Sequence, residues 1–455
     1  MVSVFCMFFR RSNKMVVRPR AEHCVSRRNI DAEALKVLRR LSDLGYTAYL
    51  VGGSVRDLLM GRKPKDFDVG TDAHPTDIRN TFRNCFLIGR RFRLAHIVFG
   101  KKVIETSTFR RSPDATDDEY GHYQFEDNTF GTPEEDAKRR DFTINGLFYD
   151  IKTFAVIDYV GGLKDLDKRV LRSIGDPNVR FREDPVRMMR AIRFAARLDF
   201  SIDRASRKAI HKYHADILNA SPPRVCEEVY RLFMFGASCK SFRMMWEYGL
   251  MKDLLPKLDD CVRASGGKKA MLWRYLAALD ADAIGEGASN GLRTAVLYYP
   301  IFKAHLASEK QKIPQGKINW LSVARNSLAE ISDHLHLPKM ALLTAQYLMD
   351  HQRRFEEEPR RDTRTFRFIQ HEDFEMAFAL RRIVLAAEGA DMTLFDRWQA
   401  FCHEKGNPRP GSHEQGRQNR ERRRRMRDRK RGNGGASGED APRADPAGSP
   451  PAEGN

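Results

Sequence analysis

The chain has 455 residues, more than one hydrophobic core usually supports, so two or three domains are expected. Its formal net charge of +19 favours a polyanionic partner, either nucleic acid or an anionic membrane surface. The seven cysteines have no paired spacing, and no apolar run approaches the roughly 20 residues of a membrane span. We therefore expect a cytoplasmic protein with reduced thiols, with peripheral membrane association as an alternative.

Residues 1–28 are basic and are expected to form a poorly structured arm. In the apolar segment 1–10 the basic residues follow rather than precede the apolar ones, which is the wrong order for a secretory signal. Translation can start at Met1 or at Met15, and the sequence does not decide between them. Residues 31–44 carry a helical apolar stripe and predict an amphipathic helix that ends at Gly45.

Residues 46–68 predict a strand, a tight turn and a short helix, in that order. The apolar run 48–51 predicts a buried strand. Gly52 and Gly53 break it, because glycine allows a sharp turn and a close approach of the backbone to a ligand. Ser54 is a good N-cap for the following helix, and the N–H groups at a helix start favour an anion such as phosphate.

Asp66 and Asp68 lie two residues apart, at the start of a second predicted strand. Side chains two apart in a strand point to the same face, so both carboxylates are expected on one side. Two carboxylates beside a phosphate-binding turn outline a Mg²⁺ site. An isolated Asp-x-Asp is more often a polar strand edge, but its distance from the glycine turn favours the functional interpretation.

A basic segment follows a probable short strand at 85–88. Arg90, Arg91 and Arg93 are expected to hold a triphosphate or an RNA backbone, with a solvated loop as the alternative. Residues 103–109 alternate like a strand. If that strand lies beside the one with the two aspartates, Glu105 supplies a third carboxylate for two divalent ions; a surface glutamate is the equal alternative.

Residues 111–135 are polar and acidic and predict a mobile loop, followed by a helix-like stretch at 138–148. Within that stretch, Arg140 and Asp141 are expected to pair at the active cleft, although a structural ion pair is a serious alternative. From Arg180 onward the pattern is helical.

Asp184 is expected to cap a helix that has Pro185 at its first position. Asp184, Arg187 and Arg190 recur every three residues, so they share one face and can read a base edge; a plain helix cap with solvated arginines is the alternative. Residues 205–405 predict an all-α half. Beyond 405 the composition indicates a disordered, arginine-rich tail that binds phosphate backbones or only aids solubility.

The ordered set of motifs resembles the nucleotidyltransferase superfamily. Gly52-Gly53-Ser54 with Asp66 and Asp68 is similar to its signature. Glu105, the segment 139–145 and the segment 183–187 resemble the successive motifs of its class II branch. That branch holds CCA-adding tRNA nucleotidyltransferases and bacterial poly(A) polymerases, and residues 87–96 resemble the segment that marks the polymerases.

This resemblance implies an α+β chain. It consists of an N-terminal nucleotidyltransferase head with a mixed five-stranded sheet (residues 29–165), a helical neck with a nucleotide-recognition helix (166–255), a helical RNA-binding body and tail (256–405) and the disordered basic C-terminus (406–455).

The resemblance also implies roles for single residues. The implied catalytic acids are Asp66, Asp68, Asp141 and Glu105, with Asp66 and Asp68 holding the metal. Whether Asp141 or Glu105 is the third catalytic acid stays open. The implied nucleotide-binding residues are Gly52, Gly53, Ser54, Arg56, Arg140, Asn145, Asp184, Arg187 and Arg190.

The implied activity is template-independent addition of AMP from ATP to RNA 3′ ends, supported by two Mg²⁺ ions. The first alternative is CCA addition to tRNA, and the second is a non-catalytic RNA-binding adaptor. The expected partners are RNA 3′ ends, with RNA-binding or degradation-complex proteins as further candidates. The oligomeric state stays open.

Overall fold

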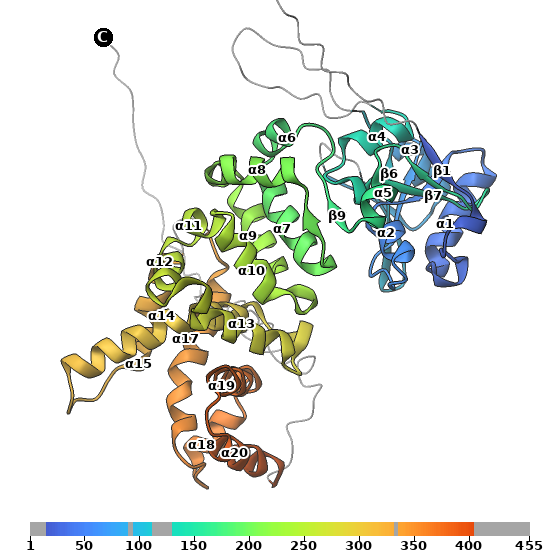
Figure 1. Cartoon of the computed structure of the whole chain (residues 1–455). Coiled ribbons are helices and arrows are strands. Elements are labelled where there is room, and N and C mark those ends of the chain that lie inside the picture. The colour runs from blue at the N-terminus through green and yellow to red at the C-terminus, as the bar shows by residue number, and fades with distance from the viewer. Residues whose placement is uncertain (1–14, 90–93, 112–129, 332–334, 405–455) are drawn as a thin grey trace, which may run out of the picture.

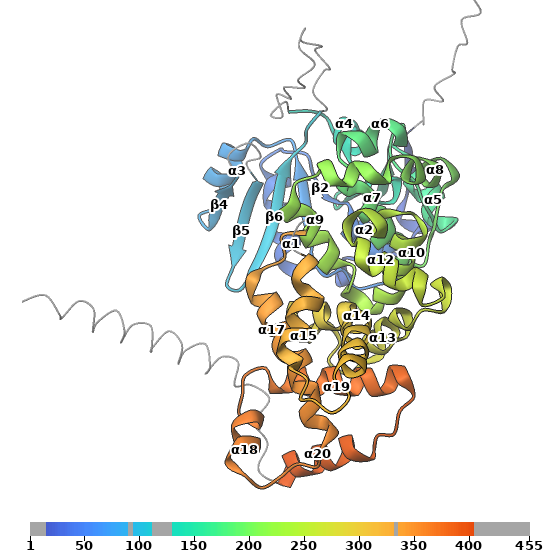
Figure 2. The ribbon, with the colours of Figure 1, turned by 90° about the vertical axis from the view of Figure 1, so that its left-hand side faces the viewer.

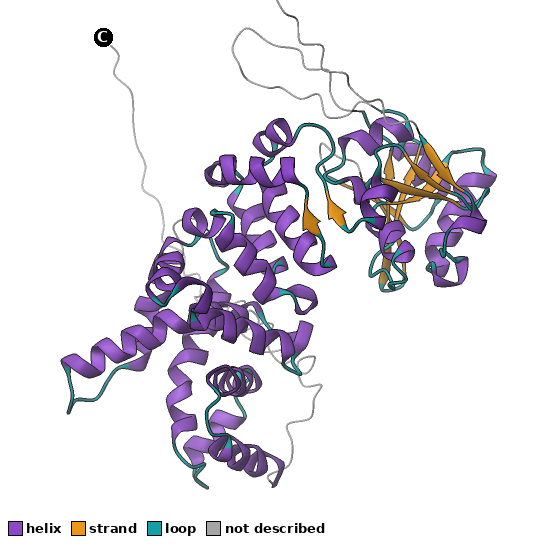
Figure 3. Ribbon diagram, viewed as in Figure 1, coloured by secondary structure: helices purple, strands orange, loops and turns teal. Residues whose placement is uncertain are grey.

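The computed structural model describes residues 15–89, 94–111, 130–331 and 335–404. It confirms an α+β chain with a sheet in its N-terminal part and helices in the remainder (Figures 1 and 3). Arg90, Arg91 and Arg93, most of the acidic loop and the basic tail lie outside the described residues. No described helix combines the length and the apolar character that a membrane crossing requires.

The sheet has eight strands rather than the expected five, in the order β1-β8-β7-β2-β3-β6-β5-β4. The strands are β1 (Val16–Arg18), β2 (Ala48–Val51), β3 (Asp68–Thr71), β4 (Cys85–Ile88), β5 (Leu94–Phe99), β6 (Lys102–Thr108), β7 (Leu147–Asp150) and β8 (Val156–Asp158). The pairing of β3 with β6 is parallel and the other pairings are antiparallel, so the sheet is mixed, as expected.

Two segments form strands of the sheet that the sequence did not predict. Residues 15–28 are not a poorly structured arm, since Val16–Arg18 pairs with β8 as the edge strand and Val25 is fully buried. The stretch 138–148 is not one helix, because Leu147 and Phe148 belong to β7, which pairs with β2 and β8. A short apolar run that is buried on both faces has no periodicity that separates strand from helix.

Helices cover the two faces of the sheet unequally. The predicted helix α1 (Ala32–Asp43), which Asp31 caps, and helix α3 (Pro75–Thr81) pack on one face, where Leu50, Val69 and Ile97 are buried. On the other face, Val51 and Phe148 are covered by a smaller cluster that includes Ala137 of α4 (Pro133–Arg139). Helices α2 (Gly53–Leu59) and α5 (Gly162–Asp167) complete this part, which we call the head.

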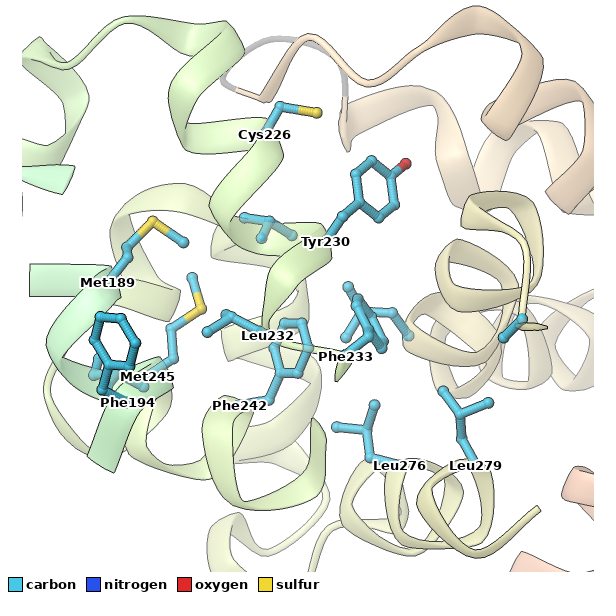
Figure 4. Packing of buried hydrophobic residues seen from close by; sticks show 14 of the residues in the cluster. Met189, Phe194, Cys226, Tyr230, Leu232, Phe233, Phe242, Met245, Leu276 and Leu279 are labelled. Carbon is cyan, nitrogen blue, oxygen red and sulfur yellow. The ribbon is translucent and has the colours of Figure 1, made fainter. Parts of the chain in front are cut away.

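The following helices form the neck: α6 (Pro177–Glu183), α7 (Val186–Leu198), α8 (Arg204–Tyr213), α9 (Pro222–Arg231) and α10 (Ser238–Glu247). A two-residue parallel pair, β9 (Val170–Leu171) with β10 (Ser201–Ile202), joins them to the head side. Figure 4 shows Met189 and Phe194 of α7 beside Met245 of α10, within the core that holds α7 in place.

The rest of the described chain is helical, as expected, and extends away from the sheet (Figure 2). It contains α11 (Leu250–Leu254), α12 (Pro256–Ala264), α13 (Met271–Ala281), α14 (Asn290–Lys312), α15 (Trp320–Leu328), α17 (Lys339–Asp350), α18 (Thr363–Ile369), α19 (Phe374–Glu388) and α20 (Thr393–Glu404).

Ion pairs join the head to the neck. Asp141, which follows α4, accepts from Arg190 of α7 at 2.6 Å, and Asp57 of α2 accepts from Arg197 of α7 at 3.2 Å. Burial raises the pKa of Asp141, but Arg190 and the hydrogen bonds from Asn145 and the Phe142 N–H outweigh it, so that this pKa lies below its ordinary value. The Asp141–Arg190 pair therefore stabilises the junction in its charged form.

We expect Asp141→Asn to lower the free energy of unfolding by about 2 kcal/mol at pH 7, since a hydrogen-bonded charge pair loses its anion. An acid with a depressed pKa in the folded state contributes stability above its unfolded pKa, near 3.9, and loses it as the pH falls through the folded value. The difference between the variant and the parent protein should therefore shrink below about pH 4. Urea unfolding at pH 7 and at pH 3.5 measures it.

Asp167→Asn is the control, because its ion pair with Arg18 is at the surface, where such pairs contribute less than about 1 kcal/mol. A destabilisation by Asp141→Asn that stays constant down to pH 3 would contradict the assigned charge state.

Candidate functional site

A cavity of about 690 Å³ lies between the head and the neck. It brings together every predicted nucleotide-binding residue, both predicted metal ligands and Asp141. These lining residues are Gly52, Gly53, Ser54, Arg56, Asp66, Asp68, Arg140, Asp141, Asn145, Asp184, Arg187 and Arg190. Segments more than 130 residues apart in the sequence therefore meet at one site, as the motifs together predict.

The glycine turn at the cavity depends on Gly52. Its φ of +71° is in the region that favours glycine, and a Cβ atom there would lie 2.9 Å from the Arg140 Nη1 atom. The prediction for Ser54 was wrong: Gly52 holds the N-cap position and α2 begins at Gly53. The glycine pair lets the chain enter the helix one residue earlier, and the Ser54 hydroxyl instead donates to the Val51 carbonyl at 3.0 Å.

Both predicted metal ligands line the cavity, but only one of them is on a strand. β3 begins at Asp68, so Asp66 lies in the connection before the strand rather than on it. Burial raises the pKa of Asp68 to about 6, with Glu105 and Asp66 adding to the rise and Arg140 opposing it. Glu105 and Asp66 are therefore each close enough to Asp68 to disfavour its charged form.

Glu105 is placed beside the aspartates, as the strand pattern predicted, but it does not line the cavity. β6 pairs in parallel with β3, and Val69 opposite Thr106 places Glu105 next to Asp68. The Glu105 side chain is half exposed and lies 3.7 Å from the His96 Nε2 atom. Among the described residues, no group of three or more potential ligands is close enough to hold a metal ion. Asp66 and Asp68 therefore form a pair without a third ligand in this conformation.

The expected pairing of Arg140 with Asp141 was wrong. α4 ends at Arg139, so the Arg140 side chain turns back by four residues and donates to Asp136 at 2.9 and 3.0 Å. Both Asp141 oxygens are used elsewhere, Oδ2 by Arg190 and Oδ1 by the Phe142 N–H at 2.7 Å and by the amide of Asn145.

Asn145 extends this network to the turn. Its Oδ1 atom accepts from Arg56 at 2.6 Å, and Arg56 also binds Asp57. Arg56 is almost completely buried. Both side chains thus tie the glycine turn to Asp141.

Asp184 is not the N-cap that the sequence suggested. It is the C-cap of α6, and Pro185 separates it from α7, which begins at Val186. Its Oδ2 atom accepts from Arg224 at 2.8 Å, while its Oδ1 atom is buried and has no hydrogen-bond partner among the described residues. Arg187 lies on the same cavity wall and donates to the Arg180 carbonyl at 3.1 Å. An acceptor and a donor are therefore held side by side on the neck.

Sequence reasoning missed several arginines of the cavity. Arg193 continues the three-residue spacing of Arg187 and Arg190, so that spacing could have found it. Arg224 and Arg231 come from α9 and reach the cavity only because α9 packs on α7, which no local pattern reveals. With these additions the lining has nine basic and five acidic side chains, a balance that suits a polyphosphate.

Three family models match the chain in sequence order. "Poly A polymerase head domain" matches residues 48–172, "Probable RNA and SrmB- binding site of polymerase A" matches residues 199–262, and "Polymerase A arginine-rich C-terminus" matches residues 320–431.

Whole-chain similarity distinguishes between the two branches. Poly(A) polymerase I of Salmonella typhi is 38% identical over 412 residues, which are 87% of this chain and 87% of the relative. A CCA-adding enzyme of Lactobacillus helveticus is 36% identical over 245 residues, only 53% of this chain and 58% of the relative. The crystal structure of a CCA-adding enzyme from Bacillus stearothermophilus in complex with CTP superimposes with a TM-score of 0.59 at 26% identity, covering 81% of this chain and 82% of that one.

The similarity to the CCA-adding enzymes in sequence thus covers about half of the chain, whereas the similarity to the polymerase extends over most of it and includes the arginine-rich segment. The chain belongs to the poly(A) polymerase I family of class II nucleotidyltransferases and is a polynucleotide adenylyltransferase.

Proposed function

We propose that the cavity between the head and the neck is the site where AMP passes from ATP to an RNA 3′-hydroxyl, with Asp66 and Asp68 as the Mg²⁺ ligands. The observation that carries this proposal is the meeting of these carboxylates with the glycine turn and with the Asp184–Arg187 wall in one cavity. A phosphate-binding turn, a cation site and a base-reading wall are the parts that nucleotidyl transfer needs.

The two aspartates fit a divalent cation. Carboxylate oxygens are the ligands that Mg²⁺ prefers. Within the described part of the chain, neither Asp66 nor Asp68 is used in a hydrogen bond or an ion pair. When bound there, Mg²⁺ would make the 3′-hydroxyl more acidic and neutralise charge on the triphosphate. The chain itself adds the arginines of α7 and α9, which favour the polyanionic substrate in the cavity.

Asp184 and Arg187 are proposed to select adenine. The exocyclic amino group of adenine is a donor, and the buried Oδ1 atom of Asp184 is an acceptor that no group in the described part of the chain occupies. Arg224 fixes the other Asp184 oxygen at 2.8 Å and so orients the carboxylate. A base that presented an acceptor at this position would leave two buried acceptors facing each other, which is unfavourable.

The two candidates for a third acid are assigned different roles. Both oxygens of Asp141 are engaged, so we propose that it positions Asn145 and Arg190 and takes no direct part in the chemistry. Glu105 is the candidate for additional negative charge near the metal, because its charge raises the pKa of Asp68 from the adjacent strand.

RNA is the second substrate of the proposed reaction. The matched RNA- and SrmB-binding region covers α8 to α11 and most of α12, so we propose that this part of the helical half contacts the RNA body. A cytoplasmic location follows from the substrates, ATP and RNA. The comparisons give no support to peripheral association with a membrane.

We expect Asp68→Asn to lower AMP incorporation into an RNA primer by at least about a thousandfold, because the neutral amide is a poor ligand for Mg²⁺ and leaves the triphosphate charge uncompensated. RNA affinity should change by less than about twofold, since the phosphate-binding arginines remain. Primer extension and filter binding measure the two effects. Asp43→Asn, an exposed aspartate at the end of α1, is the control. Full extension by Asp68→Asn would refute the metal role.

We expect long A tracts when each of the four nucleoside triphosphates is offered separately with a non-tRNA primer. Asp184→Asn should raise the KM for ATP about tenfold and reduce the preference for ATP over UTP, because the amide can present a donor to the adenine amino group, whereas uracil presents a carbonyl acceptor. Two C residues followed by one A, on tRNA only, would instead identify a CCA-adding activity. Unchanged selectivity in Asp184→Asn would move base recognition away from this wall.

A further inference from the structure

One edge of the sheet has a buried face and an exposed apolar face. Ile97 and Ile104 point to the buried face, under α1 and α3. On the opposite face Phe86 is 63%, Ile88 49% and Val103 43% exposed. The solvent face of an antiparallel sheet is ordinarily polar, so adjacent apolar side chains there indicate a contact surface. We call the surface formed by Phe86, Ile88, His96, Val98 and Val103 the outer sheet face.

The outer sheet face continues directly into the candidate metal site. His96 stands opposite Glu105, and Phe86 stands opposite His96, while the β3–β6 register places Asp68 beside Glu105. Cross-strand partners lie on the same face, so these four residues form one row across β3, β6, β5 and β4. Neighbouring strands are about 4.8 Å apart, so the row spans about 14 Å, the length of about four stacked nucleotides.

Two exposed basic residues lie at one end of this face. Exposed Arg83 precedes β4, and exposed Lys101 lies in the turn between β5 and β6. Because β4 and β5 are antiparallel, both lie at one end of the strands, and the parallel β3–β6 pair places Asp66 at the same end. Cations beside apolar and aromatic side chains favour single-stranded nucleic acid over an uncharged partner. Figure 2 shows β4, β5 and β6 side by side, with β4 at the outer edge of the sheet.

We propose that the outer sheet face binds the last few nucleotides of the RNA primer, with bases stacked on Phe86 and His96 while the 3′ end reaches Asp66 and Asp68. This inference rests on the proposed function in one respect, since it takes the two aspartates as the place of the 3′-hydroxyl. Stacking on aromatic rings tolerates any base, which suits an enzyme that extends RNAs of different sequence.

The test is a fluorescent primer bound to the full-length protein without ATP. An RNA with 2-aminopurine at about the fourth position from its 3′ end should be quenched on binding to the parent protein. Phe86→Ala should abolish most of the quenching and weaken primer binding about tenfold, and Phe86→Trp should restore both. In steady state, Phe86→Ala should raise the KM for a short primer about tenfold while the KM for ATP stays constant.

Leu44→Ala is the matched control, because Leu44 is a similarly exposed apolar residue of the head, at the end of α1 and on the covered side of the sheet. Equal quenching in Phe86→Ala and the parent protein would overturn the proposal, as would a loss that Phe86→Trp does not restore. A change in oligomeric state on gel filtration, without a change in RNA affinity, would also overturn it and assign the face to a second copy of the chain.

The same assay separates this inference from the proposed reaction. Asp68→Asn should keep the quenching while losing AMP transfer. If the metal role is refuted, the quenching assay can therefore still test base stacking on Phe86. If Asp68→Asn is inactive but the quenching never depends on Phe86, only the inference about the outer sheet face fails.

Discussion

The position of Asp68 within the sheet is the constraint on which the site depends. In β3 it stands opposite Val51 of β2 and beside Glu105 of β6. Successive side chains of a strand alternate between faces, so a shift of one residue would bury the carboxylate under α1 and expose Val69. The row that contains Asp68 is covered at Val51 and Phe148 and uncovered beyond Glu105. The Asp68 carboxylate therefore lies at the boundary between the buried and the exposed part of this sheet face.

The second requirement is a fixed relation between the head and the neck. The metal-ligand candidates belong to the head, whereas Asp184 and Arg187 belong to the neck. Asp141 and Asp57 hold α7 through Arg190 and Arg197, and both aspartates are tied to the glycine turn, one through Asn145 and one through Arg56. Charged contacts of this kind are directional, so they fix orientation where apolar packing alone would allow sliding.

Local patterns predicted the parts of the site that lie in one segment. The strand before Gly52, helix α1, the strand with Glu105 and the convergence of the motifs in one cavity are all present. The failures have tertiary causes. β1 and β7 form because they pair with β8 and β2. Arg140 pairs with Asp136 rather than Asp141, because α4 ends at Arg139 and the Arg140 side chain lies back along the helix. Arg224 reaches Asp184 only through helix packing, which the sequence around it does not encode.

The division of the cavity between two parts of the chain has a consequence for how such an enzyme can diverge. If base choice depends on the neck and chemistry on the head, then a substitution at the Asp57–Arg197 contact, which makes no base contact in the proposed scheme, can tilt one wall against the other. Nucleotide preference would then drift while Asp184, Arg187 and the two metal-ligand candidates stay the same. Closely related enzymes with identical motifs can in this way differ in the nucleotide that they incorporate.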